Sequence, residues 1–377
     1  MVVHSSGTPI KFTDIEDEFG VINGTNTRKL GSYRVSETYG GLTTPLDSGV
    51  PQSGAISFSD FYSKRLNLIV NYYDGANETR ITPKSNYDSD TGVSVVGPGN
   101  KSRPTNTGSS SASGGSKVIV HVNKAIGSVQ GTSDSEQSKC ALRTGEWDSG
   151  TQLEINVGGS GKILGGGGNG GRGGGGGSGD SYGGNPGFNG TSALGIEYSG
   201  TSVVVQNSGV IQTGYPGGGG GAGAKRQNRR ADGHAAGGGG GGGAGFPAGA
   251  GGEHGPNGEH QFGHDGSAGE VTTETDGSLE TAVGGEGGAG YENRSAHSGP
   301  GGDGAVLPGS ENTEGGTGGD SSGNQSGEGA AGGDPGSAIR KSADAVGYTL
   351  TIESGGVVTG EQANTSASSG GTDIGVA

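Results

Sequence analysis

Residues 165–179 read GGGGNGGRGGGGGSG, with only Asn169, Arg172 and Ser178 between the glycines. Similar tracts follow along the chain, at residues 217–224, 237–252, 284–290, 299–304, 315–319 and 327–336. Glycine loses more backbone freedom on folding than any other residue, and it brings no side chain to a core. The tracts therefore allow two interpretations. They are flexible linkers, or they are polyproline II helices whose backbones approach closely because no side chain separates them.

The composition argues against one ordinary globular core. The chain has 377 residues, of which 93 are glycine and 13 are proline, and its hydrophobic fraction is 27%. No Gly-X-Y period persists and proline is scarce, which excludes collagen. Two or three modules are expected rather than one globule.

Charge and targeting signals narrow the class of protein further. The net charge of −15 argues against nucleic acid as a partner. The single cysteine, Cys140, cannot form an internal disulfide. No run approaches the roughly 18 apolar residues of a membrane span. The first residues, MVVHSSGTPIKF, lack the charged and apolar regions of a signal peptide, so we expect assembly inside a cell and release with a particle.

Two segments near the N-terminus share one pattern, TPIKFTDIEDEFG at 8–20 and GAISFSDFYSKRL at 54–66. Thr13 followed by Glu16 has the spacing of a capping box, and Ser59 before Asp60 is a good N-cap. Each segment therefore predicts an extended entry into a short helical turn, within a small module at residues 1–64. Its predicted core residues are Phe12, Ile15, Phe19, Phe58, Phe61 and Tyr62.

A β-rich module is predicted at residues 65–150. The segments LNLIVNYY (66–73), VSVVG (93–97) and KVIVHVN (117–123) are rich in strand-forming residues. Trp147, the only tryptophan, is expected to be a packing anchor.

A strand–turn–strand cassette recurs three times, at residues 157–165, 205–214 and 352–360. In each copy, alternating apolar residues lead into a polar turn whose glycine supplies a positive φ, and a second short strand ends in glycine. Such a unit is typical of a solenoid coil, which stacks on its neighbours because it cannot bury its face alone. The first two copies lead directly into glycine tracts. This favours helices with a fixed starting point over linkers.

The predicted fold is therefore mainly β and polyproline II, with very little α-helix. Polyproline II rises about 3.1 Å per residue with three residues per turn and no internal hydrogen bonds. Its backbone groups must find partners on neighbouring helices, which only glycine lets approach closely. We expect β-solenoid-like cassettes and a polyproline II bundle (a polyglycine sandwich) over residues 151–361, and a C-terminal tail at 362–377. The longest rods, of about 50 Å, are expected from 165–180 and 237–252.

A family resemblance rests on three sequence features. IKFTDI (10–15) with EFG (18–20), followed by VPQSGAISFSDFY (50–62), resembles the opening segment of many tailed-phage tail fibre and tail-tip proteins. VQNSGVI (205–211) followed by GGGGG (217–221) is similar to the C-terminal regions of tail-tip proteins of long-tailed phages. Glycine tracts alternating with variable loops resemble the polyglycine-sandwich adhesins of T-even-like phages, although the N-terminal attachment domain of those adhesins is not matched here.

The resemblance implies a receptor-binding protein, or adhesin, of a bacteriophage tail fibre or tail tip. It implies assembly in the host cytoplasm, a place in the virion tail, and attachment to other tail proteins through residues 1–64. The expected receptor is a host surface glycan or an outer-membrane protein. We expect no catalytic residue, cofactor, metal ion or nucleic acid. The chain is a monomer or a homotrimer on this basis. A structural spacer without receptor contact and a polysaccharide depolymerase are the alternatives.

Receptor contacts are expected in the loops between the glycine tracts. KRQNRR (225–230) is suited to phosphate or carboxylate groups, because guanidinium forks match them, or it is a solvated loop. EHGPNGEHQFGHD (253–265) gathers histidines for sugar contact or plain exposure, and its spacing fits zinc poorly. Carboxylates between 270 and 280 are interpreted as an acidic loop rather than a glycosidase pair. The candidate residues are Tyr182, Phe188, Lys225, Arg226, Arg229, Arg230, His234, Phe246, His254, His260, Phe262, His264, Tyr291 and His297.

Overall fold

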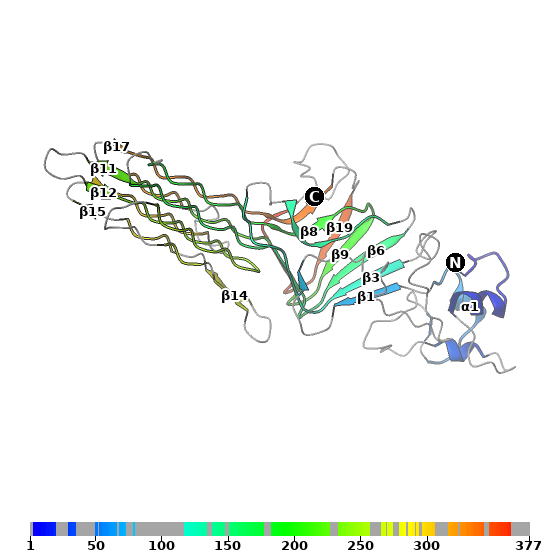
Figure 1. Ribbon diagram of the computed structural model, residues 1–377. Helices are drawn as coiled ribbons and strands as arrows, with labels where there is room; N and C mark the ends of the chain where they lie inside the picture. Colours follow the sequence, from blue (N-terminus) through cyan, green and yellow to red (C-terminus); the bar gives the residue numbers. More distant parts are fainter. Residues whose placement is uncertain are drawn as a thin grey trace.

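The structure is a computed structural model of the chain. It describes residues 3–19, 29–34, 50–51, 53–65, 68–72, 78–79, 117–133, 138–147, 151–176, 182–226, 233–256, 265–268, 270–273, 279–283, 286–290, 292–293, 296–305, 316–322, 325–342 and 347–362. Figure 1 shows three parts in a row: a small N-terminal module, a set of parallel β-sheets, and a long glycine-rich bundle. No described helix has the length and apolar character needed to cross a membrane.

The N-terminal module is built from short helical turns around an aromatic core. Its elements are α1 (Phe12–Phe19) and the 3-10 turns η1 (Leu30–Tyr33) and η2 (Phe58–Phe61). Phe19, Tyr33 and Phe61 are buried, and their rings lie 6.2–6.5 Å apart. The predicted helical turns are confirmed.

The caps of these turns differ from the sequence prediction. The carboxylate of Asp14 accepts the backbone N–H of Lys11 at 2.6 Å, and that of Asp60 accepts the N–H of Ser57 at 2.7 Å. In both segments an aspartate therefore reaches back three residues, and neither Thr13 nor Ser59 is the N-cap. Phe58 is 37% exposed rather than buried, and its ring packs edge-on against the partly buried Phe12.

Three parallel sheets form a β-helix, in which successive coils add one strand to each sheet. The first sheet contains β1 (Leu68–Tyr72), β3 (Lys117–Val122), β6 (Gln152–Val157), β9 (Thr201–Val205) and β19 (Tyr348–Ile352). The second contains β2 (Glu78–Thr79), β4 (Ala125–Gly127), β7 (Lys162–Leu164), β10 (Val210–Gln212) and β20 (Val357–Thr359). The third contains β5 (Cys140–Arg143), β8 (Ser192–Ile196), β18 (Ser337–Lys341) and β21 (Glu361–Gln362).

The core of the β-helix consists of apolar rows that run from coil to coil. Val120, Ile155 and Val203 are paired in register across β3, β6 and β9, and all three are fully buried. Each such row is a ladder of in-register neighbours on one sheet face. The hydrophobic cluster continues through all three sheets, so the β-helix holds most of the buried apolar side chains.

The three predicted cassettes are confirmed as the strand pairs β6–β7, β9–β10 and β19–β20. A glycine at positive φ, predicted for each turn, is found only in the third copy, so the prediction is wrong for the first two. Gly355 has a φ of +91° in the third copy, whereas in the second copy Ser208 takes the left-handed conformation, with a φ of +66°. Gly161 is needed for another reason. A Cβ there would lie 1.9 Å from the carbonyl oxygen of Val122 in the preceding coil.

The glycine-rich bundle is inserted at one corner of the β-helix. The chain leaves after β7 and returns at β8, and it leaves again after β10 and returns at β18. Residues 165–191 and 213–336 are therefore two excursions between the second and the third sheet. The sheets also cross the predicted boundary at residue 150, since β1 to β5 belong to the same β-helix as the cassettes.

Backbone hydrogen bonds in the bundle repeat every three residues. The N–H groups of 165, 168, 171 and 174 donate to the carbonyls of 212, 215, 218 and 221, each at 2.8 Å. Those of 167, 170, 173 and 176 donate to the carbonyls of 247, 250, 253 and 256. The carbonyls of 166, 169 and 172 accept from 191, 188 and 185. The rod 165–176 thus bonds each of its neighbours at every third residue, a spacing that matches the threefold repeat of polyproline II.

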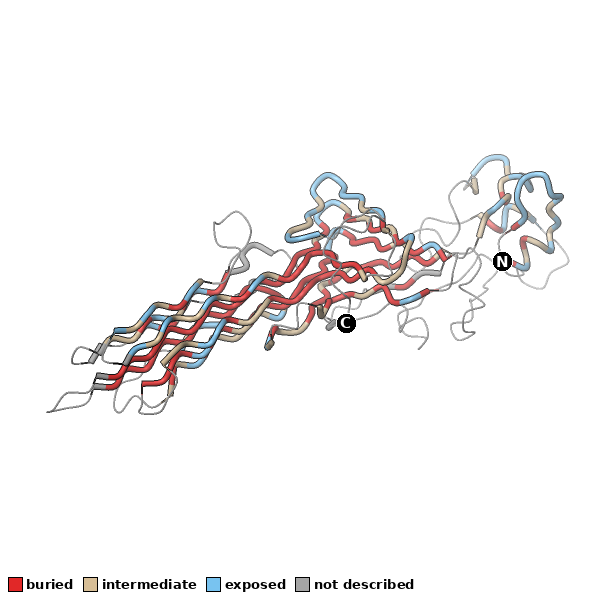
Figure 2. Tube along the Cα trace, turned by 90° about the horizontal axis from the view of Figure 1, so that it is seen from above, coloured by how far each residue is buried: buried red, intermediate tan, exposed pale blue. Residues whose placement is uncertain are grey.

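Side-chain volume is excluded where these rods touch. A Cβ on Gly170 would lie 1.9 Å from the carbonyl oxygen of Gly240, and one on Gly220 would lie 2.0 Å from that of Arg172. Most rod residues in the middle of the bundle are buried (Figure 2). The backbone therefore packs against backbone, and the core of the bundle is made of peptide groups.

One predicted rod is wrong. Residues 237–252 do not form a single rod, because the chain reverses at Phe246 and Pro247. The N–H groups of 249, 252 and 255 donate to the carbonyls of 243, 240 and 237, which is an antiparallel pairing of 237–246 with 247–256. The interruption AGFPAG within the tract was the sequence signal for this reversal.

Candidate functional site

The end of the bundle farthest from the N-terminal module is closed by short β-strands (Figure 1). β11 (Ala224–Arg226) pairs antiparallel with β12 (Gly233–Ala235) and with β17 (Gln325–Ser326). β15 (Glu292–Asn293) and β16 (Ala296–His297) form a hairpin beside them. We refer to these five strands as the distal end. They hold together the rods that the glycine tracts form.

Lys225 and His234 face each other across β11 and β12, and both are buried. The Nδ1–H of His234 donates to the carbonyl oxygen of Gly176 at 2.6 Å. Lys225 is 3% exposed, because strands flank β11 on both sides, so it does not lie in an exposed loop, which both predicted roles of KRQNRR required. The backbone of Arg226 ends β11, while Arg229 and Arg230 lie outside the described residues.

His254 and Asp265 join two rods at the bases of the segment 257–264. The carboxylate of Asp265 accepts from the backbone N–H of His254 at 2.8 Å and from its imidazole Nδ1–H at 2.6 Å. His260, Phe262 and His264 lie outside the described residues. Within the described part of the chain, no group of three or more histidines, cysteines or carboxylates is placed to hold a metal ion.

The aromatic candidates are spread along the bundle. Tyr182, half-buried, lies near the distal end, where its carbonyl accepts the N–H of Gly223 at 2.8 Å. Phe188 lies within the same rod, and its N–H donates to the carbonyl of Asn169. His297 lies in β16 and exchanges two backbone hydrogen bonds with Ser322. Tyr291 is outside the described residues.

Phe246 is at the opposite end of the bundle from β11 and β12. Its N–H donates to the carbonyl of Gly165, and its own carbonyl accepts from Ser128, which follows β4. A Cβ on Gly127 would lie 2.5 Å from the ring of Phe246. Phe246 therefore packs the base of the bundle against the β-helix. Among the candidates that the structure describes, those near the distal end are Tyr182, Lys225, Arg226, His234, His254 and His297.

The described rods carry a set of surface carboxylates that was not predicted from the sequence. Because the rods repeat every three residues, glycines face inward while one residue in three is free to carry a side chain. Arg172 is the only exposed lysine or arginine on the described rods. The exposed acidic residues there are Glu253, Asp265, Glu286, Asp303, Asp320, Glu328 and Asp334. The sequence signal for these surface positions was a spacing by a multiple of three residues within one rod, as between Glu328 and Asp334.

Some polar side chains on the rods accept a backbone N–H where no carbonyl of a neighbouring rod is available. Asn169 Oδ1 accepts the N–H of Ala250 at 2.8 Å, Asp303 Oδ1 that of Gly287 at 2.8 Å, and Asp320 Oδ1 that of Gly329 at 3.0 Å. A rod at the surface has fewer neighbours than one inside, so side-chain acceptors satisfy the backbone donors that remain.

The segment 270–283, predicted as an acidic loop, contains a hairpin instead. β13 (Glu270–Thr273) pairs antiparallel with β14 (Leu279–Val283), with a register irregularity between Thr272 and Thr273. Strand-forming residues on both sides of a turn account for this pairing.

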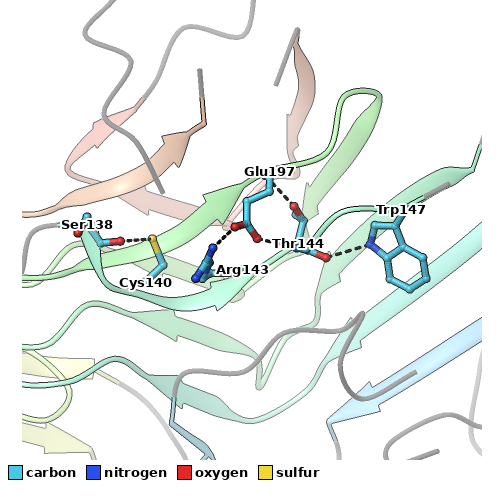
Figure 3. Close-up of polar contacts among 7 residues, drawn as sticks. Ser138, Cys140, Arg143, Thr144, Trp147 and Glu197 are labelled. Atoms are coloured by element: carbon cyan, nitrogen blue, oxygen red, sulfur yellow. Dashed lines mark hydrogen bonds and ion pairs between the residues drawn. The ribbon is translucent and has the colours of Figure 1, made fainter. Parts of the chain in front are cut away.

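A polar network ties the third sheet to the segment after β5 (Figure 3). Glu197 pairs with Arg143 and accepts the N–H of Gly145 at 2.9 Å, while its own N–H donates to Thr144 Oγ1 at 2.8 Å. Trp147 is 6% exposed and donates its indole N–H to the carbonyl of Thr144 at 2.9 Å, so its predicted role as a packing anchor is confirmed. The network joins its members to one another and is structural, although Arg143 Nε makes no hydrogen bond.

No known protein family matches this sequence, and no curated protein matches it either. Among solved structures, the chain is similar to one described as the gp37-gp38 adhesin tip complex of the bacteriophage S16 long tail fiber. The identity is 14%, the TM-score is 0.27, and the match covers 84% of this chain and 90% of that chain. At this identity and score the similarity supports no statement about function.

Proposed function

We propose that this protein is a non-enzymatic adhesin of a bacteriophage tail fibre or tail tip. In this proposal the N-terminal module attaches the chain to other tail proteins, and the distal end of the bundle contacts a host glycan or outer-membrane protein. The observation that carries the proposal is the arrangement in Figures 1 and 2, in which the rods end together at the pole opposite the N-terminal module.

The bundle is suited to presenting loops on a rigid support. Its rods are cross-linked by backbone hydrogen bonds to several neighbours, so the ends of the rods are held in fixed positions relative to one another. Binding residues concentrate on loops that a rigid scaffold positions. Display of several copies on one particle would strengthen weak individual contacts.

The charge distribution favours contact through the end of the bundle over contact along its side. The described rods expose seven carboxylates and one arginine, as given above, so the sides of the bundle are acidic. Bacterial surface glycans that carry phosphate or carboxylate would repel such a side. The basic segment 225–230, which begins in β11 at the distal end, has the charge that attracts these groups.

Binding of fluorescently labelled protein to cells of the bacterium that its phage infects tests the proposal. The double substitution Arg229→Ser with Arg230→Ser should lower cell binding at least about tenfold, since each lost charge-assisted contact weakens binding by about 1.5–3 kcal/mol. Arg172→Ser, on the side of the bundle, is the matched control and should leave binding unchanged. Substitutions in 253–264 form a second set. Unchanged binding in both distal sets would refute the assignment of the distal end.

A structural role without receptor contact is the second candidate. The burial of Lys225 and His234 favours it, because these residues close the bundle rather than project from it. Purified protein that neither coats host cells nor blocks infection would establish this role. A depolymerase would instead shorten host polysaccharide on incubation, which size-exclusion chromatography detects, and we expect no shortening.

A further inference from the structure

Arg340 is a buried arginine without a hydrogen-bond partner. It lies in β18, the strand through which the chain re-enters the β-helix after the last rod of the bundle, with β8 on one side and β21 on the other. Its exposed fraction is 2%, and Nε, Nη1 and Nη2 make no hydrogen bond. Each guanidinium carries five N–H donors in a planar fork, so Arg340 leaves all of them unused.

A neighbouring strand of this sheet carries an arginine whose charge is paired with a carboxylate, although its Nε makes no hydrogen bond. Arg143 and Arg340 occupy the same register row, on opposite sides of Gly195. Arg143 pairs with Glu197, whose second oxygen accepts the N–H of Gly145 (Figure 3). Both oxygens of the Glu197 carboxylate therefore contact groups in β5 or just after it. No second carboxylate bonds Arg340.

An unpaired buried charge is costly. Transfer of a charged group out of water without a partner costs several kcal/mol, and buried polar groups in native proteins almost always find one. Burial lowers the pKa of Arg340, and the nearby Cys140 and Glu361 oppose this effect without hydrogen-bonding to the guanidinium. A guanidinium stays protonated under all ordinary conditions. The remaining way to satisfy it is a bound anion.

We propose that Arg340 binds a small inorganic anion, of the size of chloride, within the third sheet. Arg340 is 2% exposed, so the occupant must be small enough to lie among the strands around it. The anion neutralises the buried charge and accepts from the guanidinium fork. It thereby stabilises β18, which fixes the returning end of the bundle to the β-helix. This site is independent of receptor binding.

Crystals of the full chain grown in sodium bromide provide the direct test, because bromide substitutes for chloride and scatters anomalously. We expect an anomalous peak at hydrogen-bond distance from the Arg340 guanidinium. No peak there, or the carboxylate of Glu361 in its place, would overturn the proposal. This test needs no variant and so does not depend on one that folds.

Thermal unfolding supplies a second, quantitative test. In sodium chloride the wild-type Tm should rise saturably above its value in sodium gluconate of equal ionic strength, by roughly 3 °C. Arg340→Met should abolish the difference between the two salts. Arg143→Met is the matched control: it should lower Tm in both salts and keep the chloride response. A wild type without a chloride-specific rise, or an Arg340→Met variant that responds like the wild type, would contradict the proposal.

Discussion

The glycine at position 170 is required by a neighbouring carbonyl oxygen rather than by an unusual backbone dihedral. A valine there would place its Cβ 1.9 Å from Gly240 O and 2.5 Å from the carbonyl carbon. Both atoms are backbone atoms, so no side-chain rotation relieves the contact and the rods must separate. Overpacking of an ordinary core costs about 1–3 kcal/mol, and this rigid contact should reach the upper end of that range or exceed it.

Gly170→Val is therefore expected to lower the free energy of unfolding by about 3 kcal/mol or more, as measured by urea unfolding. Ala331→Val is the matched control, since Ala331 is exposed on a rod surface and its substitution should change stability by less than about 0.5 kcal/mol. If Gly170→Val is as stable as the wild type, the tract is a linker and the packed bundle is wrong.

Tyr215 is a buried residue whose side chain has a hydroxyl group without a hydrogen-bond partner. It is 1% exposed and packs with Ala244 and Ala305, but its hydroxyl makes no hydrogen bond, and burial raises its pKa. Tyr215→Phe removes a buried unsatisfied group and is expected to raise the free energy of unfolding by about 1 kcal/mol. In Tyr198→Phe, the same change removes a hydroxyl that donates to the carbonyl of Thr151 at 3.0 Å, so stability should fall by about 1 kcal/mol. Denaturant unfolding of both variants measures the difference, and equal effects would show that the Tyr215 hydroxyl has a partner.

At the scale of elements, the outer face of the first sheet carries a group that responds to pH. Burial lowers the pKa of His121 below its ordinary value of 6.5, although the charge of Glu154 acts in the opposite direction. The unfolded chain then binds a proton at a higher pH than the folded chain does. Stability is full above the unfolded pKa and falls as the pH drops below 6.5 toward the folded pKa.

Glu154 acts in a separate and more acidic range. Burial raises its pKa, but the hydrogen bonds from Lys117 and Asn156 outweigh burial and leave it below 4.5, so its contribution is lost only as the pH falls below that value. His121→Gln should therefore flatten the dependence of Tm on pH between about pH 7.5 and about pH 5. The more acidic part should remain but become smaller, because the charge of His121 helps to lower the pKa of Glu154. An unchanged slope in the variant would assign the dependence to another group.

The sequence predicted individual elements far better than their partners. Alternation of apolar residues around a polar turn identified all three cassettes, because each is a local pattern of period two that its own residues define. Nothing local shows that Val120 pairs with Ile155, so β1 to β5 were assigned to a separate module although they complete the same sheets. The glycine tracts predicted close packing correctly, but the direction of each rod depends on turns such as the one at Phe246.

The candidate site was predicted less well for a related reason. The loop positions were inferred from composition, and composition does not distinguish a solvated lysine from Lys225, which two strands enclose. Phe246 was predicted to contact a receptor because it is an aromatic residue within a glycine tract. It packs on Gly127 instead, a contact between residues more than a hundred positions apart that no sequence pattern contains.

At the scale of the whole molecule, the β-helix and the bundle differ in what stabilises them. The β-helix contains nearly all of the large hydrophobic cluster, together with the N-terminal module. In the bundle, the described clusters are Tyr215 with Ala244 and Ala305, and Ala224 with Ala235. Apolar burial is the main favourable term in folding, and ordering glycine is the most costly per residue. The bundle must therefore depend on the β-helix, which fixes both ends of each excursion, whereas the β-helix does not depend on the bundle.

Removal of residues 213–336, with a short glycine linker between Gln212 and Ser337, tests this asymmetry. The corner can be closed in this way, because the last coil already joins β20 to β21 through Gly360 alone, at a φ of +117°. The shortened protein should keep a cooperative unfolding transition and a β-type circular dichroism spectrum, while the excised segment expressed alone should show neither a cooperative transition nor protection of its amides from hydrogen exchange. A folded isolated bundle would show that backbone hydrogen bonds between glycine rods suffice without an apolar core. An unfolded shortened protein would show instead that the excursions hold the coils together, and the direction of dependence would be reversed.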